Sequence, residues 1–147
     1  MVEGVVNFTK VDATVACGGE TTHEAIAELA RQGFTSVVNL RLPSEPGVTE
    51  EADVVQAAGL RYFHLPMNPN APEFETATAF LDVVADSSNQ PVYIHCASAN
   101  RVGGVWAIKR VVQDGWTREQ AIEEAQAIGM RSPVMLDFVT RFLDNHA

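Results

Sequence analysis

Short runs of β-branched and aromatic residues alternate with longer stretches of helical periodicity, and this alternation restricts the fold more than any other feature of the chain. The runs SVVNLR at residues 36–41, RYFHLP at 61–66 and PVYIH at 91–95 are each followed by a stretch with helical spacing. Strands joined by helical crossovers lie parallel in one sheet, with helices packed on its faces. We therefore predict an α/β fold with a central, mostly parallel sheet flanked by helices on both faces.

The remaining elements follow from local signals. We expect further strands at residues 4–9 and 15–17. We expect helices from Thr21 to a stop at Gly33, and at about residues 49–58, 72–86, 102–114, 117–128 and 133–145, the last three forming a helical C-terminal flank. Thr21 and Glu24 have the spacing of a capping box, and Pro72 suits the first position of its helix. The chain has no internal repeat, so residues 1–147 are predicted to form a single domain.

Composition excludes several classes of function. The net charge is −9, and no basic stripe is present, so we expect no nucleic-acid partner. No apolar run has the length of a membrane span, so we expect no membrane partner. Two cysteines do not form a disulfide framework, which favours a reducing, cytoplasmic location. The N-terminal residues lack a signal-peptide pattern, although a signal removed from a longer precursor would leave no trace here.

The segment HCASANR, residues 95–101, carries the strongest chemical signal. Cys96 directly follows the apolar run at 91–95, and Arg101 begins a helical stretch. Ligands in open α/β sheets bind at the carboxyl ends of the strands, where a loop leads into the next helix. The amides of a helix N-terminus, together with an arginine, favour the binding of an anion and the thiolate form of a cysteine. A cysteine at the end of a buried strand is often only a small core residue. The His–Cys pair with an arginine five residues on nevertheless points to a nucleophile in an anion-binding loop.

These residues resemble a known family. HCxxxxR after a buried strand, with NLR and YFHLP ending two earlier strands, is similar to the cysteine-dependent phosphatases of the protein tyrosine and dual-specificity superfamily. Over about residues 11–110 the chain resembles a bacterial branch, the phosphatase-like domain of the β-lactamase hydrolase-like proteins. The resemblance implies a phosphatase-like α/β fold and a phosphoric monoester hydrolase that needs neither metal nor cofactor. Its partner would be a phosphorylated protein or a small phosphate ester, and the oligomeric state stays open.

The resemblance also assigns roles to individual residues. It implies that Cys96 attacks a phosphate monoester and forms a phosphocysteine, which water then hydrolyses. The phosphoryl oxygens would be held by Arg101 and by the loop amides of Ala97, Ser98, Ala99 and Asn100. His95 would tune Cys96 through its hydrogen bonds, against the alternative of a core histidine. Arg41 would face the same rim, where it would bind the phosphate or pair with a carboxylate such as Glu45.

Three departures within the loop keep two other functions open. Four residues separate Cys96 from Arg101, where the common superfamily loop has five; four is the spacing of the bacterial branch and of many rhodanese-type sulfurtransferases. Ala99 stands where related loops usually carry glycine, and Val102 stands where they often carry a hydroxyl. The alternatives are therefore a rhodanese-like sulfurtransferase with a persulfide on Cys96, and a catalytically weak anion-binding relative.

The general acid is the largest departure. The superfamily uses an aspartate on the loop after the HLP-type strand, and the loop MNPNAPEFE has none. We predict Glu73 as the acid, with Glu75 as its neighbour and the glutamates at 45, 50 and 51 as weaker candidates. A reversible Cys17–Cys96 disulfide is a further alternative.

Overall fold

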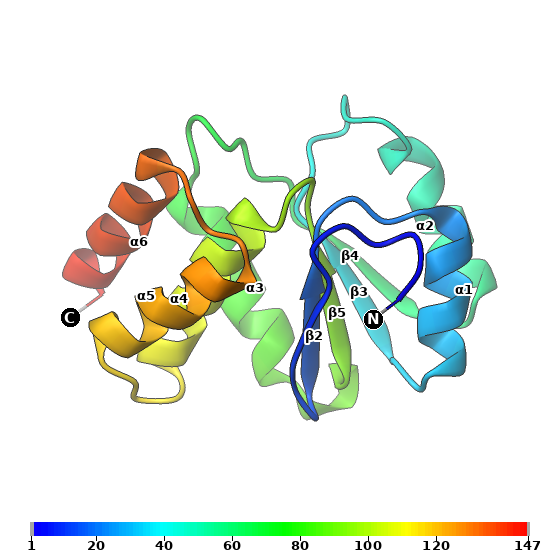
Figure 1. Cartoon of the computed structure of the whole chain (residues 1–147), viewed down its shortest axis with the longest axis horizontal. Coiled ribbons are helices and arrows are strands. Elements are labelled where there is room, and N and C mark those ends of the chain that lie inside the picture. Colours follow the sequence, from blue (N-terminus) through cyan, green and yellow to red (C-terminus); the bar gives the residue numbers. More distant parts are fainter. Residues whose placement is uncertain (1, 147) are drawn as a thin grey trace.

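The structure, a computed structural model that describes residues 2–146, is built on one five-stranded sheet in the order β1-β2-β5-β3-β4 (Figure 1). The strands are β1 (Thr9–Asp12), β2 (Val15–Gly18), β3 (Ser36–Asn39), β4 (Arg61–His64) and β5 (Val92–His95). Only β1 runs antiparallel to its neighbour; β2, β5, β3 and β4 are parallel. The predicted α/β class with a mostly parallel sheet is confirmed.

Helices cover both faces of the sheet, as the helical crossovers require. On one face lie α1 (His23–Arg31) and α2 (Val48–Ala57), and on the other lie α3 (Phe74–Ala85), α4 (Asn100–Val112), α5 (Arg118–Ile128) and α6 (Pro133–Asn145) (Figure 1). A short 3₁₀ turn, η1 (Ser87–Asn89), precedes β5. None of the helices found within residues 2–146 combines the length and the apolar character that a bilayer crossing needs.

The central strand β5 divides the core into two layers, because successive strand residues point to opposite faces. Tyr93 packs with the apolar residues of α1 and α2, whereas Ile94 packs with those of α3 to α6. All four residues of β5 are buried. The carboxyl end of this strand is thereby held from both faces, and the chain leaves it at Cys96.

The predicted strand at residues 4–9 is wrong. Gly4 has φ +87° and Asn7 has φ +53°, so the backbone there turns twice into the left-handed region and cannot run extended. The one isolated β-bridge of the described residues joins Val5 to Thr21, and the regular strand begins at Thr9. The segment instead lies against the loop that follows β5.

Three predicted helix starts are also displaced, in α1, α3 and α4, and α4 begins at Asn100 rather than at about residue 102. Thr22, not Thr21, caps α1, because the hydroxyl of Thr21 is buried and hydrogen-bonds the Tyr93 hydroxyl at 2.6 Å. Helix α3 begins two residues after Pro72, because Glu73 keeps an extended backbone and serves as its N-cap residue. The strands at 36–41 and 61–66 end two residues earlier than predicted, since the chain turns at the edge of the sheet where the candidate site lies.

Candidate active site

The loop from Cys96 to Arg101 connects β5 to α4 at the carboxyl edge of the parallel strands. Cys96 is 1% exposed, and its amide donates to the carbonyl of Gly18 on the neighbouring strand at 3.3 Å. Helix α4 begins at Asn100, and its N-cap residue, Ala99, supplies no side-chain cap. The first amides of a helix have no partner within the helix, so this end is open to an anion.

The carbonyls of the loop are held by the surrounding protein. The carbonyl of Ala97 accepts from the amide of Glu20 at 2.7 Å, and that of Ser98 accepts from Asn7 Nδ2 at 3.1 Å and Arg131 Nη2 at 3.4 Å. A carbonyl and the amide that follows it point in opposite directions across a trans peptide. The amides of Ser98 and Ala99 therefore point away from these outer partners. Among residues 2–146, no protein group accepts from the amides of residues 97–101.

Two neighbouring glycines let other segments press close to this loop. A Cβ on Gly19 would lie 2.5 Å from the carbonyl oxygen of Ala97, and one on Gly129 would lie 2.7 Å from the Cβ of Ala99. Ala99 itself has φ +71°, a left-handed conformation that costs an alanine about 1–2 kcal/mol. The loop therefore keeps a left-handed residue without glycine, and the packing around it holds Ala99 there.

Arg101 reaches back from α4 and is held by the loop that follows β3. Its two terminal nitrogens each donate to Glu45, at 2.8 Å to Oε1 and 2.8 Å to Oε2, and Nη1 also donates to the carbonyl of Met67 at 3.1 Å. The side chain of Arg101 is 5% exposed. Burial alone would lower its pKa, but the hydrogen bonds with Glu45 and the electrostatic interaction with Cys96 outweigh burial and raise it. Arg101 is thus a fixed cation beside the sulfur.

Glu45 remains ionised in this pair. Burial alone would raise the pKa of its carboxyl, but hydrogen bonds from Arg101 and from the amide of Leu42 outweigh burial and hold that pKa below its ordinary value. An ionised carboxylate has no proton to give, so Glu45 is unsuited to the role of general acid. Its geometry makes it the residue that orients Arg101.

A second cluster of ionisable side chains is buried next to the loop. Glu51 Oε2 is 2.6 Å from His95 Nε2, and Glu51 Oε1 is 3.2 Å from Arg41 Nη2. His95 and Glu51 are both 0% exposed, and Arg41 is 3% exposed. Arg41, which we expected at the rim of the site, is therefore buried in an ion pair. Its carboxylate partner is Glu51 rather than Glu45. A role for Arg41 in phosphate binding stays a prediction.

No hydrogen bond or ion pair among the described residues links the predicted acid, Glu73, to the loop. Glu73 is exposed at the start of α3, without a side-chain hydrogen bond to its helix, and Glu75 is exposed at the first turn of that helix. The segment between β4 and α3 reaches the site through the carbonyl of Met67. The role of Glu73 stays a prediction.

Cys17 lies on β2 beside the site. It is 0% exposed, and burial raises the pKa of its thiol far above the ordinary range. Cys17 is therefore a neutral core thiol. Both cysteines are free, and a disulfide between them stays a prediction.

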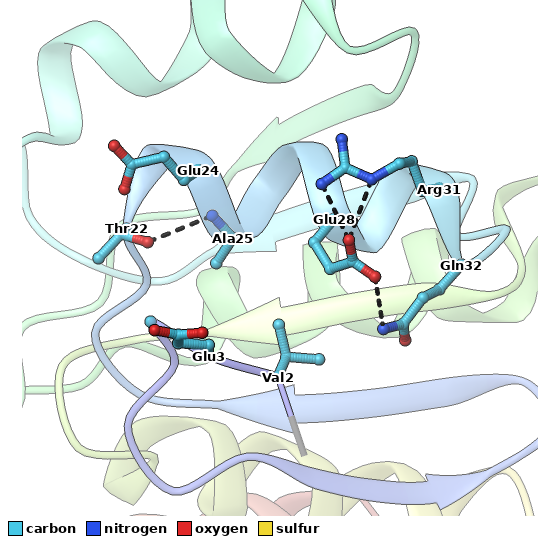
Figure 2. A pocket seen from close by; sticks show the side chains of 9 residues that line it. Val2, Glu3, Thr22, Glu24, Ala25, Glu28, Arg31 and Gln32 are labelled. Atoms are coloured by element: carbon cyan, nitrogen blue, oxygen red, sulfur yellow. Dashed lines mark hydrogen bonds and ion pairs between the residues drawn. The ribbon is translucent and has the colours of Figure 1, made fainter.

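A separate hollow lies between the N-terminal segment and α1 (Figure 2). It has a volume of about 730 Å³, and Glu3, Glu24 and Glu28 are among the residues that line it. Figure 2 shows Glu28 paired with Arg31 and Gln32 on the helix. No residue of the Cys96–Arg101 loop lines this hollow, and its carboxylates have the wrong sign for a phosphate. Within residues 2–146, no group of three or more His, Cys, Asp or Glu side chains is arranged to hold a metal ion.

The Cys96–Arg101 loop can be found from the sequence, but the residues that hold it in shape cannot. The sequence suggests Glu45 as an acid or as the partner of Arg41, and its position four residues after Arg41 gives no sign of Arg101 as the true partner. The side chain of Asn100 accepts from the amides of Arg131 and Ser132 at 2.8 and 3.2 Å, so it anchors the loop to the α5–α6 linker. Such contacts across long sequence separations carry no local signal.

Comparisons with known proteins agree with this fold. The family described as "DSP-PTPase phosphatase fused to NAD+ Kinase" matches residues 3–137. The chain is 26% identical over 128 residues to a β-lactamase hydrolase-like protein of Xylella fastidiosa, covering 84% of this chain and 28% of that protein. The chain therefore spans under a third of that relative's length.

Two solved structures share the fold. The core catalytic domain of the PP-IP phosphatase SIW14 from S. cerevisiae superposes with a TM-score of 0.81 at 20% identity, covering 97% of this chain and 88% of that one. The P. aeruginosa protein TpbA (C132S), solved in complex with pTyr, superposes with a TM-score of 0.76 at 21% identity, covering 95% and 86%.

Proposed function

Because the chain belongs to the family of DSP-PTPase phosphatases fused to NAD+ kinase, we propose that it hydrolyses phosphate monoesters through a phosphocysteine on Cys96. One observation carries this proposal. The loop from Cys96 to Arg101 holds a buried sulfur, a fixed arginine and five amides without an acceptor among the described residues in one place. Phosphoryl transfer to sulfur requires a thiolate nucleophile that is surrounded by hydrogen-bond donors for the phosphoryl oxygens.

In the proposed reaction, the Cys96 thiolate donates an electron pair to phosphorus while the bond from phosphorus to the leaving oxygen breaks. The loop amides and Arg101 hold the equatorial oxygens, whose charge they stabilise as the transition state forms. Water then attacks the phosphocysteine, inorganic phosphate leaves, and the thiolate is restored. Glu45 and Met67 keep Arg101 oriented throughout.

Aryl esters such as phosphotyrosine are the favoured substrate class. A phenol leaves more readily than an alcohol, so an aryl ester depends less on a strong general acid. No hydrogen bond or ion pair among the described residues links Glu73 to the loop. The complex of TpbA with pTyr supports this choice, since that protein shares the fold. SIW14, a PP-IP phosphatase, also shares the fold, so a phosphorylated small molecule is the second candidate substrate.

The test is a paired assay on the wild type, Cys96→Ser and Arg101→Ala. One arm uses p-nitrophenyl phosphate and a phosphotyrosine peptide, and the other uses thiosulfate with cyanide. We expect phosphate release from the wild type, its loss in both variants, and no thiocyanate. Cys17→Ser is the matched control, and it should retain activity because Cys17 is a buried neutral thiol.

Other outcomes contradict specific parts of the proposal. Thiocyanate without phosphate release would identify a sulfurtransferase, and phosphate bound without turnover would identify a weak anion-binding relative.

Glu73→Gln, compared with Glu75→Gln, tests the predicted general acid. Glu73→Gln should slow the hydrolysis of an alkyl phosphate about 10²-fold and leave that of p-nitrophenyl phosphate nearly unchanged. Equal effects of the two variants would remove Glu73 from the mechanism.

A further inference from the structure

The carboxylate of Glu51 is buried without access to solvent. Two chains of contacts start from it, the first arm through His95 and the second arm through Arg41, and both lead to the Cys96–Arg101 loop. One oxygen contacts His95 and the other contacts Arg41, at 2.6 and 3.2 Å. A buried carboxylate is expensive to desolvate, so it persists only where its partners compensate for its charge. Glu51 projects from α2, which otherwise has no residue in the site.

The first arm leads to the nucleophile. His95 Nδ1 has no partner among the described residues, and the ring stacks on Tyr93 with centroids 5.5 Å apart. An unpaired acceptor is less costly to bury than an unpaired N–H, so the proton of a neutral ring belongs on Nε2, where it is donated to Glu51. The bond to Glu51 therefore fixes the ring of His95, and the next residue in the chain is Cys96.

The second arm leads to Arg101. Arg41 binds Glu51 through Nη2 and donates through Nη1 to the carbonyl of Pro46 at 2.8 Å. Pro46 directly follows Glu45, whose carboxylate holds both terminal nitrogens of Arg101. The planar guanidinium of Arg41 thus bridges the fixed carboxylate on α2 and the segment that carries Glu45.

We propose that Glu51 is a positioning residue for the proposed phosphatase reaction, because it sets the placement of Cys96 through His95 and the placement of Arg101 through Arg41, Pro46 and Glu45. It touches neither substrate nor sulfur. The inference rests on the proposed function for its catalytic meaning, but the placement of Cys96 and Arg101 is measurable without turnover.

The experiment compares Glu51→Gln with two controls on the same helix. Asp53→Asn makes the same change of charge at an exposed position, and Val55→Ala removes buried volume from α2 without touching the ion pairs. Each protein is measured for kcat and KM, for inorganic phosphate binding by calorimetry, for thermal unfolding, and for alkylation of Cys96 by iodoacetamide across pH, with peptide mapping to separate Cys96 from Cys17.

We expect Glu51→Gln to lower kcat by about tenfold to a hundredfold, as small displacements of reacting groups do. Phosphate binding should weaken by at least about threefold, and the alkylation profile should move to higher pH, since a misplaced Arg101 stabilises the thiolate less. Asp53→Asn should leave all of these unchanged. Val55→Ala should lower the unfolding temperature and leave the Cys96 profile in place.

Two results would overturn the proposal. If Glu51 acted only through its charge, removing that charge would favour the thiolate, and the profile would move to lower pH. If Glu51 were only a structural residue, Glu51→Gln would lose thermal stability like Val55→Ala, with an unchanged profile and unchanged phosphate binding.

A second variant covers the case in which Glu51→Gln does not fold. Arg41→Lys keeps a cation for Glu51, but a single ammonium lacks the fork that reaches Glu51 and Pro46 together. It should weaken phosphate binding and move the alkylation profile to higher pH; no change in either would refute the second arm. A wild type without turnover would refute the proposed function alone, because alkylation and phosphate binding still report on placement.

Discussion

At the scale of single residues, Arg101 is the group on which most of the site depends. Its Nη1 donates to Glu45 and to the carbonyl of Met67, and its Nη2 donates to Glu45, so the orientation of the guanidinium is set while a second N–H of Nη2 is left for the substrate of the proposed reaction. Preorganised donors need no rearrangement as charge develops, which is the main way that an enzyme stabilises a transition state electrostatically. The loop after β3 is in this sense as much a part of the site as the loop after β5.

The lowered pKa of Glu45 gives a prediction for stability against pH. A carboxyl whose pKa is lower in the folded than in the unfolded state stabilises the fold above its ordinary pKa and loses this contribution as pH falls through its folded value. Glu45→Gln should therefore be less stable than the wild type at pH 7, by about 1–3 kcal/mol from the lost charged hydrogen bonds. Urea unfolding at several pH values measures the difference.

The difference between Glu45→Gln and the wild type should shrink as pH falls below about 4.5, the ordinary pKa of a glutamate. Glu75→Gln, at an exposed position without an ion pair in the described residues, is the control and should show little difference at any pH. A gap between Glu45→Gln and wild type that stayed constant down to acid pH would mean that the charge of Glu45 does not stabilise the fold.

At the scale of elements, the loop after β5 keeps its shape because neighbouring segments press on it from outside. Gly19 lies against the carbonyl of Ala97 with no room for a side chain, and its own backbone is not in the left-handed region. Gly19→Ala should therefore act purely by displacing the loop, and we expect kcat/KM to fall by about tenfold or more. Steady-state kinetics on an aryl phosphate measures the effect.

Gly33→Ala separates loop displacement from simple loss of stability. Gly33 has φ +96°, and the space that a Cβ would take is open to 4 Å, so alanine there is strained but meets no neighbour. It should cost about 1 kcal/mol of stability and leave kcat/KM unchanged. Equal losses of activity in the two variants would show that the contact at Gly19 does not shape the site.

The elements differ in how far the sequence predicts them. The strand at 91–95, the last helix and the loop between Cys96 and Arg101 are predictable, because apolar runs, periodicity and a rare spacing are all local signals. The prediction of a strand at 4–9 is wrong because two left-handed residues override the apolar pattern there. The pairing of Arg101 with Glu45, 56 residues away, depends on which strand edges meet and leaves no trace in either segment.

At the scale of the whole molecule, we expect net charge to affect which substrates of the proposed reaction approach the site. The chain carries 10 basic and 19 acidic residues, yet the candidate site is suited to an anion. The attraction of the loop is local and partly buried, whereas the repulsion by the acidic surface is long-ranged and easily screened. Salt should therefore affect approach to the site more than chemistry within it.

Two phosphotyrosine peptides with opposite flanks test this expectation. From about 20 to about 200 mM salt, where the Debye length falls from roughly 20 to roughly 7 Å, kcat/KM should rise for an acidic flank and fall for a basic one. The value of kcat should change little for either peptide. Parallel salt dependence of the two peptides would contradict long-range repulsion as the cause.

The contacts that hold the loop also affect the stage of synthesis at which the candidate site is complete. Ser98 is held by Asn7, 91 residues earlier, and by Arg131, 33 residues later. A growing chain exposes its N-terminal part first, so Cys96 leaves the ribosome well before the linker that completes its surroundings. A chain that ends at α4 therefore contains Cys96 without the contact from Arg131, and under the proposed function we expect phosphate binding to begin when the last helices dock rather than when the sheet forms.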